Sequence, residues 1–322
     1  MRIELYPPLS IYEMGQRDNQ EDALWPVQAS VDDRLFVLCD GMGGYEYGEV
    51  ASQTVSQAIG SWYHARAIHP LNKPQIEDAL SYAYAQLDMK DDGELKKMGT
   101  TLTILYLGSN GVIAAHMGDS RIYHIRPISS PKLGEARRGL NEGILYQSRD
   151  HSLAFDLFQA GEITYDEMIN YPQKNVVTRA ITPGENNRMH PDITKITDIL
   201  PNDYFYICSD GMLEQMSNDE LVSILSSDMS DEEKRQQLIN ATIPNQDNHS
   251  AWILHVKDVI KEEGDEQLIN EESTSRFNAI NIILQVMAEK DNADDVVIVK
   301  RVEKSRSLLQ RMKEAVDIIM NK

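Results

Sequence analysis

Several aspartates in this sequence stand in turns at the ends of apolar runs. Asp40 follows the run LFVLC, and Asp210 follows YFYIC after one serine. The aspartates of these turns are Asp40, Asp119, Asp210 and the pair Asp294-Asp295. One aspartate in a turn is common. Because strand ends on one side of a sheet converge in space, the repetition predicts a cluster of carboxylates.

We expect such a cluster to bind a divalent cation. Carboxylates brought together out of water repel one another and lose hydration, and a cation offsets both costs. Oxygen ligands favour Mg²⁺, Mn²⁺ or Ca²⁺ over zinc or copper, and the two cysteines and eight histidines show no zinc-type spacing. Gly41, directly after Asp40, would let a backbone carbonyl approach the ion closely. A further acidic pair, Glu21-Asp22, lies in RDNQED.

The elements that must position these carboxylates are short apolar strands. Strand-type runs occupy residues 35–40, 101–107, 112–117, 121–125, 204–208 and 296–299. The turn trio Gly118-Asp119-Ser120 predicts that two of these strands form a hairpin. Apolar residues at helical spacing predict helices over about 48–67, 75–87, 218–225 and 274–288. The mixture predicts an α+β fold in which an antiparallel double sheet is flanked by α-helices.

Composition limits the classes of partner. The chain has 322 residues and a formal net charge of −20, which argues against nucleic acid or an anionic membrane surface as the main partner. The first residues, MRIELYPPLS, contain no signal-type apolar stretch, and no run approaches the roughly 18 apolar residues of a membrane span. We therefore expect a cytoplasmic protein. Cys39 and Cys208 are expected to be buried thiols rather than a disulfide.

Two stretches and the C-terminus look like additions to the core. Residues 127–143 are rich in proline, glycine and arginine and predict a loop, and residues 226–272 are polar and acidic and predict an insertion. We therefore expect a main domain over residues 1–302 and an amphipathic C-terminal helix over 303–322. That helix either docks on its own domain or, like the insertion, offers a surface to a partner protein.

Eight segments together resemble the metal-dependent serine/threonine protein phosphatases of the PPM class, also called type 2C, in a bacterial style. They run in family order from about residue 15 to residue 299. The segments are RDNQEDA, LCDGMGGYEYGEVAS, MGTTLTILYL, HMGDSRIYHIR, SRDHSLAFDLFQAGEIT, NVVTRAI, CSDGMLEQMS and DDVVIV. The resemblance implies a β-sandwich of two antiparallel sheets flanked by helices, with a metal centre at one end.

The resemblance also implies a role for each matching residue. Asp40 matches the carboxylate that bridges two Mg²⁺ or Mn²⁺ ions, and Gly41 matches a carbonyl ligand. Asp210 and Asp294 match the other direct ligands, although Asp291 remains an alternative to Asp294. The remaining matches are Glu21 to a residue that holds metal-bound water, Asp22 to its acidic neighbour that binds water or metal, Asp119 to a third, weaker metal site, and Arg17 to the arginine that grips the substrate phosphate.

The implied reaction is hydrolysis of phosphoserine or phosphothreonine in a protein substrate by a water that bridges two divalent metal ions. Three positions depart from the family pattern or leave a role open. Met42 stands where many animal members carry histidine, so no general acid is assigned there, and Glu214 replaces an aspartate. His151 is interpreted as a structural hydrogen-bonding residue rather than as the missing acid.

Two other functions remain open at this stage. A catalytically silent relative could use the same fold as a binding module, although the retained Arg17, Asp40 and Asp210 argue against it. The second alternative is a phosphatase that acts on a small phosphorylated metabolite, and the sequence contains nothing that excludes it.

Overall fold

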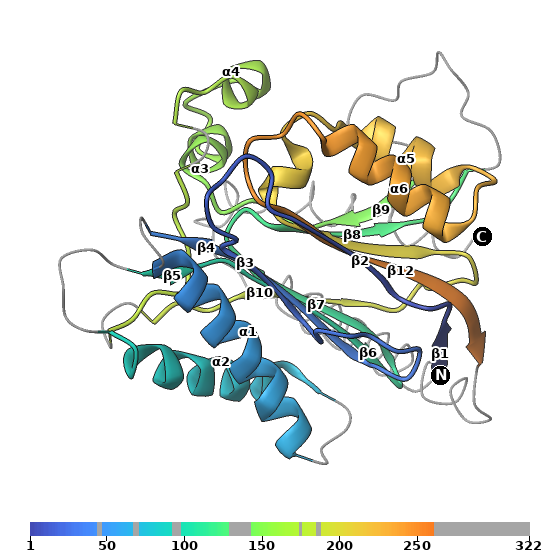
Figure 1. Ribbon diagram of the computed structural model, residues 1–322, viewed down its shortest axis with the longest axis horizontal. Helices are drawn as coiled ribbons and strands as arrows, with labels where there is room; N and C mark the ends of the chain where they lie inside the picture. Colours follow the sequence, from blue (N-terminus) through green and yellow to red (C-terminus); the bar gives the residue numbers. More distant parts are fainter. Residues whose placement is uncertain are drawn as a thin grey trace, which may run out of the picture. The chain divides into compact units, whose positions relative to one another are not determined.

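The structure is a computed structural model that describes residues 1–43, 47–66, 71–91, 98–128, 143–173, 176–184 and 188–260. Two antiparallel six-stranded sheets stack against each other (Figure 1). The first sheet has the order β1-β12-β11-β8-β9, with β2 also paired to β12. Its strands are β1 (Arg2–Leu5), β2 (Leu9–Glu13), β8 (Arg121–Ile125), β9 (Ile144–Gln147), β11 (Tyr204–Cys208) and β12 (His249–Ile260).

The second sheet has the order β10-β7-β6-β4-β3, with β5 also paired to β4. Its strands are β3 (Asp22–Trp25), β4 (Leu35–Met42), β5 (Gly99–Thr100), β6 (Leu102–Gly108), β7 (Gly111–Met117) and β10 (Asp192–Ile196). The register pairs Asp22 with Asp40 and Gly41 with Thr100, so the second sheet alone brings several predicted site residues together.

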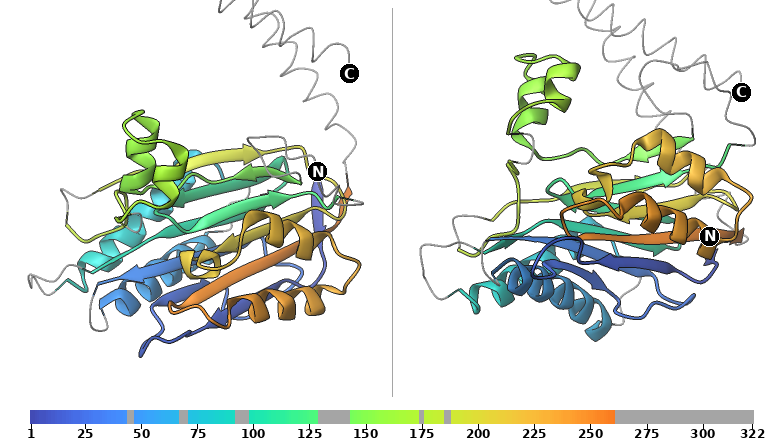
Figure 2. Two further views of the ribbon diagram at one scale, coloured as in Figure 1. Left: turned by 90° about the horizontal axis from the view of Figure 1, so that it is seen from above. Right: turned by 45° about the horizontal axis from the view of Figure 1, so that its top comes forward.

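Helices cover both outer faces of the sandwich (Figure 1). Helices α1 (Tyr47–Ala65) and α2 (Lys73–Asp88) lie against the second sheet, and α5 (Asn218–Ser226) and α6 (Asp231–Thr242) lie against the first. The short helices α3 (Leu153–Gln159) and α4 (Tyr165–Ile169) project from one end of the sandwich (Figure 2). A 3₁₀ turn, η2 (Asp210–Leu213), follows β11.

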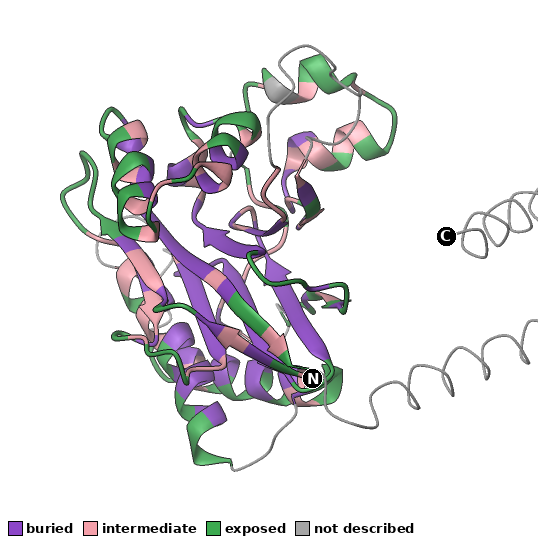
Figure 3. Ribbon diagram, turned by 90° about the vertical axis from the view of Figure 1, so that its right-hand side faces the viewer, coloured by how far each residue is buried: buried purple, intermediate pink, exposed green. Residues whose placement is uncertain are grey.

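The strands are apolar on both faces because each face meets a different core. In β4, Phe36 and Leu38 point into the core between the sheets, whereas Val37 and Cys39 point into the core beneath α1 and α2. This alternation follows from the two-residue period of a strand. It explains the unbroken run LFVLC, and the burial of the central strands is visible in Figure 3.

The predicted α+β sandwich is confirmed, but one connection was predicted wrongly. β7 and β8 do not form a hairpin, because β7 pairs with β6 and β10 while β8 pairs with β9 and β11. The turn that carries Asp119 therefore crosses from one sheet to the other. Gly118 adopts φ +108° at this crossing, a conformation that favours glycine.

The region expected to be an insertion also differs from its prediction. Its described part contains helix α6 and the long strand β12, which pairs with β1, β2 and β11 inside the first sheet. That part belongs to the core of the fold. The predicted strand 296–299, the predicted helix 274–288, most of the loop 127–143 and the C-terminal helix 303–322 lie outside the described residues.

Two further expectations can be compared with the described residues. Cys39 and Cys208 are both buried free thiols, as predicted. In the part of the chain that the structure describes, every helix is too short or too polar to cross a bilayer.

Candidate metal centre

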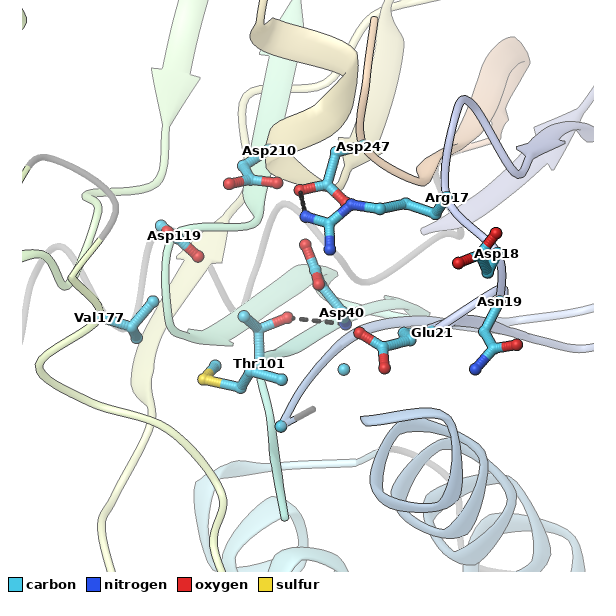
Figure 4. Close-up of a pocket in the computed structure, with 13 residues that line it drawn as sticks. Arg17, Asp18, Asn19, Glu21, Asp40, Thr101, Asp119, Val177, Asp210 and Asp247 are labelled. Carbon is cyan, nitrogen blue, oxygen red and sulfur yellow. Dashed lines mark hydrogen bonds and ion pairs between the residues drawn. The ribbon is translucent and has the colours of Figure 1, made fainter. Parts of the chain in front are cut away.

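A cavity of about 550 Å³ opens where strand ends and loops from both sheets meet (Figure 4). Six carboxylate side chains line it, together with one arginine. The lining residues are Arg17, Asp18, Asn19, Glu21, Asp40, Gly41, Met42, Gly43, Thr101, Asp119, Val177, Asp210 and Asp247. The carboxylates of Asp40, Asp119 and Asp210 come together as the sequence predicts.

Asp40 sits near the end of β4 and is anchored by its own backbone. Its N–H donates to the Thr101 hydroxyl at 3.0 Å, and its carbonyl accepts from the Thr101 N–H at 2.8 Å. Burial, followed by the charges of Asp22 and Asp210, raises the pKa of Asp40 well above its usual value. The strand therefore holds this carboxylate in a place where its negative charge is unfavourable without a cation.

Gly41 permits a close approach between β4, the loop before β3 and helix α1. A Cβ added at Gly41 would lie 2.1 Å from the Gly48 carbonyl oxygen and 2.6 Å from the Glu21 carbonyl oxygen. The Gly41 N–H donates to that Glu21 carbonyl at 3.0 Å. No larger residue fits here, and the Gly41 backbone consequently lines the cavity.

Asp119 and Asp210 extend the acidic wall from the first sheet's side. Asp119 follows the turn glycine between β7 and β8, and Asp210 begins η2 directly after β11. Burial and then the Asp210 charge raise the pKa of Asp119 to about 7. Burial and then the Asp247 charge raise the pKa of Asp210 to about 6. Both pKa values are raised by burial and by neighbouring negative charges. A bound cation would offset the effect of those charges.

Asp22 lies next to this wall but does not line the cavity. Its carboxylate is fully buried, and one oxygen accepts a hydrogen bond from the Ser209 hydroxyl at 2.9 Å. The other oxygen, Oδ1, has no hydrogen-bond partner among the described residues. Burial raises the pKa of Asp22 to about 7. The Ser250 hydroxyl lies near enough to lower the pKa of Asp22, and a cation, or a water bound to one, would satisfy the unpaired carboxylate oxygen beside Asp40.

The loop before β3 brings Arg17 and Glu21 to the opposite rim. The Asn248 side chain holds this loop. Its Oδ1 accepts from the Glu21 N–H at 2.8 Å, and its Nδ2 donates to the Met14 and Asn19 carbonyls at 2.8 and 2.9 Å. The Arg17 guanidinium reaches into the cavity and pairs with Asp247 at 2.8 Å (Figure 4).

Asp247 was missed in the sequence and is the main addition that the structure makes to the site. It lies just before β12, separated from it by Asn248, and the residues before it connect to α6. The signal was present, because Asp247-Asn248 precedes the apolar run AWILHV just as Asp294-Asp295 precedes VVIV. Asp294 and Asp291 lie outside the described residues.

Met42, Glu214 and His151, which depart from the family pattern or have an open role, lie in different places relative to the cavity. Met42 lines the cavity. Glu214 does not line it, and its carboxylate instead accepts from the Gln246 N–H at 2.8 Å. His151 is buried and accepts a hydrogen bond from the Gly118 N–H at 3.1 Å. Among the described residues that line the cavity, none is a histidine.

The donor set fits a hard divalent cation. The cavity gathers carboxylates on separate segments with raised pKa values, and one neighbouring carboxylate oxygen has no partner. Without a cation these groups stay uncharged or repel one another near neutral pH. Carboxylates and a backbone carbonyl are the ligands that Mg²⁺ and Mn²⁺ prefer.

Comparison with known proteins agrees with this chemistry. Residues 14–241 match the family described as Protein phosphatase 2C. Protein phosphatase PhpP of Streptococcus pneumoniae serotype 2 (strain D39) is 30% identical over 234 residues, which are 70% of this chain and 87% of PhpP. Among solved structures, the serine/threonine phosphatase Stp1 of Staphylococcus aureus superposes with a TM-score of 0.64 at 27% identity, covering 80% of this chain and 98% of Stp1.

A further solved structure carries metal. The catalytic domain of the serine/threonine protein phosphatase PstP, in complex with two manganese ions, superposes with a TM-score of 0.61 at 26% identity. The superposition covers 80% of this chain and all of the PstP chain. The similarity therefore extends over nearly the whole described fold.

Proposed function

This chain belongs to the protein phosphatase 2C family, and from that premise we propose that it hydrolyses phosphoserine and phosphothreonine in proteins, with Mg²⁺ or Mn²⁺ bound in the cavity described above. The observation that carries the proposal is the meeting of Asp40, Asp119, Asp210 and Asp247 from four separate segments at one cavity. The PstP structure with two manganese ions supports a centre of two ions.

We assign the ligands by position. Asp40 and the Gly41 carbonyl would hold the ions, with Asp210 and Asp247 as further ligands and Asp119 at a third, weaker position. Glu21 lines the cavity and would hold metal-bound water, whereas Asp22 would act from beside the cavity. Asp294 stays a candidate ligand from the sequence. The last family motif, however, places an aspartate before a strand, and Asp247 before β12 already supplies such a carboxylate.

The metal ions would supply a nucleophilic water near neutral pH and neutralise charge on the phosphoryl oxygens. The chain's own groups do the rest. The planar Arg17 guanidinium can donate two parallel hydrogen bonds to a phosphate, and its position at the rim would orient the phosphoryl group over the carboxylates. Met42 and Val177 contribute apolar side chains to the cavity lining. Since no histidine is among the described residues that line the cavity, water is left to protonate the leaving oxygen.

The test compares substrates under controlled metal. We expect purified protein to release phosphate from phosphoserine and phosphothreonine peptides with Mn²⁺, and to lose that activity when EDTA is added. Faster turnover of small phosphorylated metabolites than of every peptide would favour the metabolite alternative. Absence of turnover with any substrate at any Mg²⁺ or Mn²⁺ concentration would contradict the proposal and favour a silent binding module.

The partner and location are narrower proposals. We propose a phosphorylated protein as the partner and the cytoplasm as the compartment, on the family's substrate class and the chain's composition. Fractionation of cells followed by an immunoblot would test the compartment. Recovery of the protein in the membrane or secreted fraction would contradict it.

A further inference from the structure

A four-residue segment, Ser148–His151, crosses directly over the turn between β7 and β8, and we call it the strap. Each of its residues contacts the turn or the strand ends beside it. The contacts are Ser148 to Ile122 (2.9 Å, in both directions), the Arg149 carbonyl to His116 Nε2 (2.6 Å), Asp150 to Arg121 (2.6 and 2.7 Å) and His151 to Gly118. Asp119 stands inside this turn, so the strap fixes the backbone on which Asp119 sits.

His151 forms two hydrogen bonds with Gly118, one through its side chain and one through its backbone. The Gly118 N–H donates to His151 Nδ1 at 3.1 Å, and the His151 N–H donates to the Gly118 carbonyl at 2.9 Å. Because Nδ1 accepts, the ring proton is on Nε2, which faces the Asp192 carboxylate at 3.2 Å. Asp192 thereby sets the tautomer that lets His151 accept from Gly118.

Thr101 contacts the side of the turn opposite His151 and also holds it in place. Gly118 adopts φ +108°, and a Cβ there would lie 2.6 Å from the Thr101 methyl group. The Thr101 hydroxyl contacts the Ser120 hydroxyl at 2.7 Å and accepts from the Asp40 N–H at 3.0 Å. The turn is therefore fastened to β4 through Thr101 and to the strap through His151. These two attachments set the position of Asp119 relative to Asp40.

His116, His151 and Asp192 lie close enough to suggest a metal site of their own. The two imidazole rings, however, stack at 4.7 Å with an interplanar angle of 9°. Lone pairs in two parallel planes cannot converge on one ion. His151 Nδ1 is already used by Gly118, and the Arg179 guanidinium pairs with Asp192 at 2.8 Å. Hydrogen bonding toward the turn accounts for the group better than coordination does.

We propose that His151 is a positioning residue for the metal centre, and that the acceptor at its Nδ1 fixes the Asp119 carboxylate through Gly118. The inference rests on the proposed function, because Asp119 is assigned there as a metal ligand. Its consequence is specific. Loss of the Nδ1 acceptor loosens the turn and weakens metal binding at Asp119, whereas a side chain that keeps an acceptor for Gly118 without the contact to Asp192 does not.

Two substitutions separate these contacts. The amide oxygen of asparagine occupies the place of Nδ1, and the amide nitrogen of glutamine occupies the place of Nε2. His151→Asn therefore keeps the acceptor for Gly118, and His151→Gln keeps only the contact with Asp192. His124→Gln is the control, because the buried His124 side chain also pairs with an aspartate, Asp203, at 2.8 Å and does not line the cavity. Circular dichroism and thermal unfolding in EDTA verify that each variant is folded.

Three readouts are compared with wild type: Mn²⁺ binding by electron paramagnetic resonance without substrate, hydrogen exchange of the peptide covering 116–122 in EDTA, and the Mn²⁺ dependence of kcat. For His151→Gln we expect the weakest Mn²⁺ site to lose about 10- to 100-fold in affinity, faster exchange and a lower kcat at limiting Mn²⁺. His151→Asn and His124→Gln should stay within about twofold of wild type, well under the effect of a lost supporting contact.

Either of two results overturns the proposal: wild-type binding and exchange in folded His151→Gln, or equal losses in His151→Asn and His151→Gln. Both readouts are available even if wild type hydrolyses no phosphopeptide. Absence of wild-type turnover would therefore count against the proposed function, while the exchange and Mn²⁺-binding data would still decide the role of His151.

Discussion

The side chain of Asn248 accepts a hydrogen bond from the Glu21 backbone N–H at 2.8 Å and so ties the start of β12 to the loop that carries Arg17. Asn248 is buried, and its amide also donates to the Met14 and Asn19 carbonyls. One side chain thus forms hydrogen bonds with three backbone groups of the loop. Both the stability of the fold and the placement of Arg17 depend on it.

Replacing Asn248 with alanine should lower the free energy of unfolding by about 1–3 kcal/mol, because it leaves buried backbone groups without partners. We also expect a higher KM for phosphopeptide, since Arg17 loses its fixed position. Urea denaturation and steady-state kinetics measure the two effects. Asn240→Ala, which changes an exposed residue of α6, is the control, and an Asn248→Ala variant indistinguishable from it would refute this role.

Asp247 and Asp294 offer competing carboxylates for the last metal ligand. Asp247 lines the cavity, so Asp247→Asn should reduce Mn²⁺ affinity and kcat strongly, while Asp294→Asn should leave both near wild type. Isothermal titration with Mn²⁺ and phosphopeptide turnover decide between them. The reverse pattern would return the role to Asp294.

The raised carboxyl pKa values make the metal-free protein sensitive to pH. The pKa of Asp22 and of Asp119 is raised to about 7 and that of Asp210 to about 6. A pKa that is higher in the folded than in the unfolded state means that the folded protein binds more protons, so stability falls as pH rises from about 4 toward 7. Each carboxyl contributes at most about 1.4 kcal/mol per pH unit.

Urea unfolding in EDTA at pH 5 and pH 7.5 tests this for Asp22. The Asp22→Asn variant cannot ionise there, so its stability should fall less between the two pH values than that of wild type. Saturating Mn²⁺ should reduce the wild-type loss at pH 7.5, because a cation favours the ionised carboxylates. Equal pH dependence of wild type and Asp22→Asn would contradict the assignment.

Gly41 brings β4 close to the first turn of α1. Gly41→Ala would place a methyl group 2.1 Å from the Gly48 carbonyl oxygen, so we expect a loss of about 1–3 kcal/mol or more from overpacking, with lower Mn²⁺ affinity. Ser61→Ala, at an exposed position of the same helix α1, is the comparison, because it adds no atom to the contact between β4 and α1. Equal thermal stability of the two variants would disprove the steric account.

Local patterns predicted most of the strands and the placement of Asp40, Asp119 and Asp210, because each aspartate follows a turn glycine or an apolar run, with one serine between the run and Asp210. The same reasoning was wrong about the connection between β7 and β8. A glycine-rich turn has the same local chemistry whether the chain returns along its own sheet or crosses to the other. Only the packing of two sheets decides which occurs.

Asp247 shows a different limit. The apolar run AWILHV of β12 was a local sign of a strand, but it lies within a long polar and acidic stretch and was not recognised there. The strand is fixed in the sheet by β1, β2 and β11, which complete its hydrogen bonds. Because the strand was not recognised, the aspartate before it was missed as well.

The most direct measurement of the central claim is phosphopeptide turnover by purified Asp40→Asn beside wild type, at saturating Mn²⁺, with Mn²⁺ binding measured on the same samples. Asp40 pairs in strand register with Asp22 and directly precedes Gly41. We predict loss of turnover by orders of magnitude and loss of Mn²⁺ binding, with unchanged circular dichroism. Near wild-type turnover by folded Asp40→Asn would contradict a metal centre built on this carboxylate.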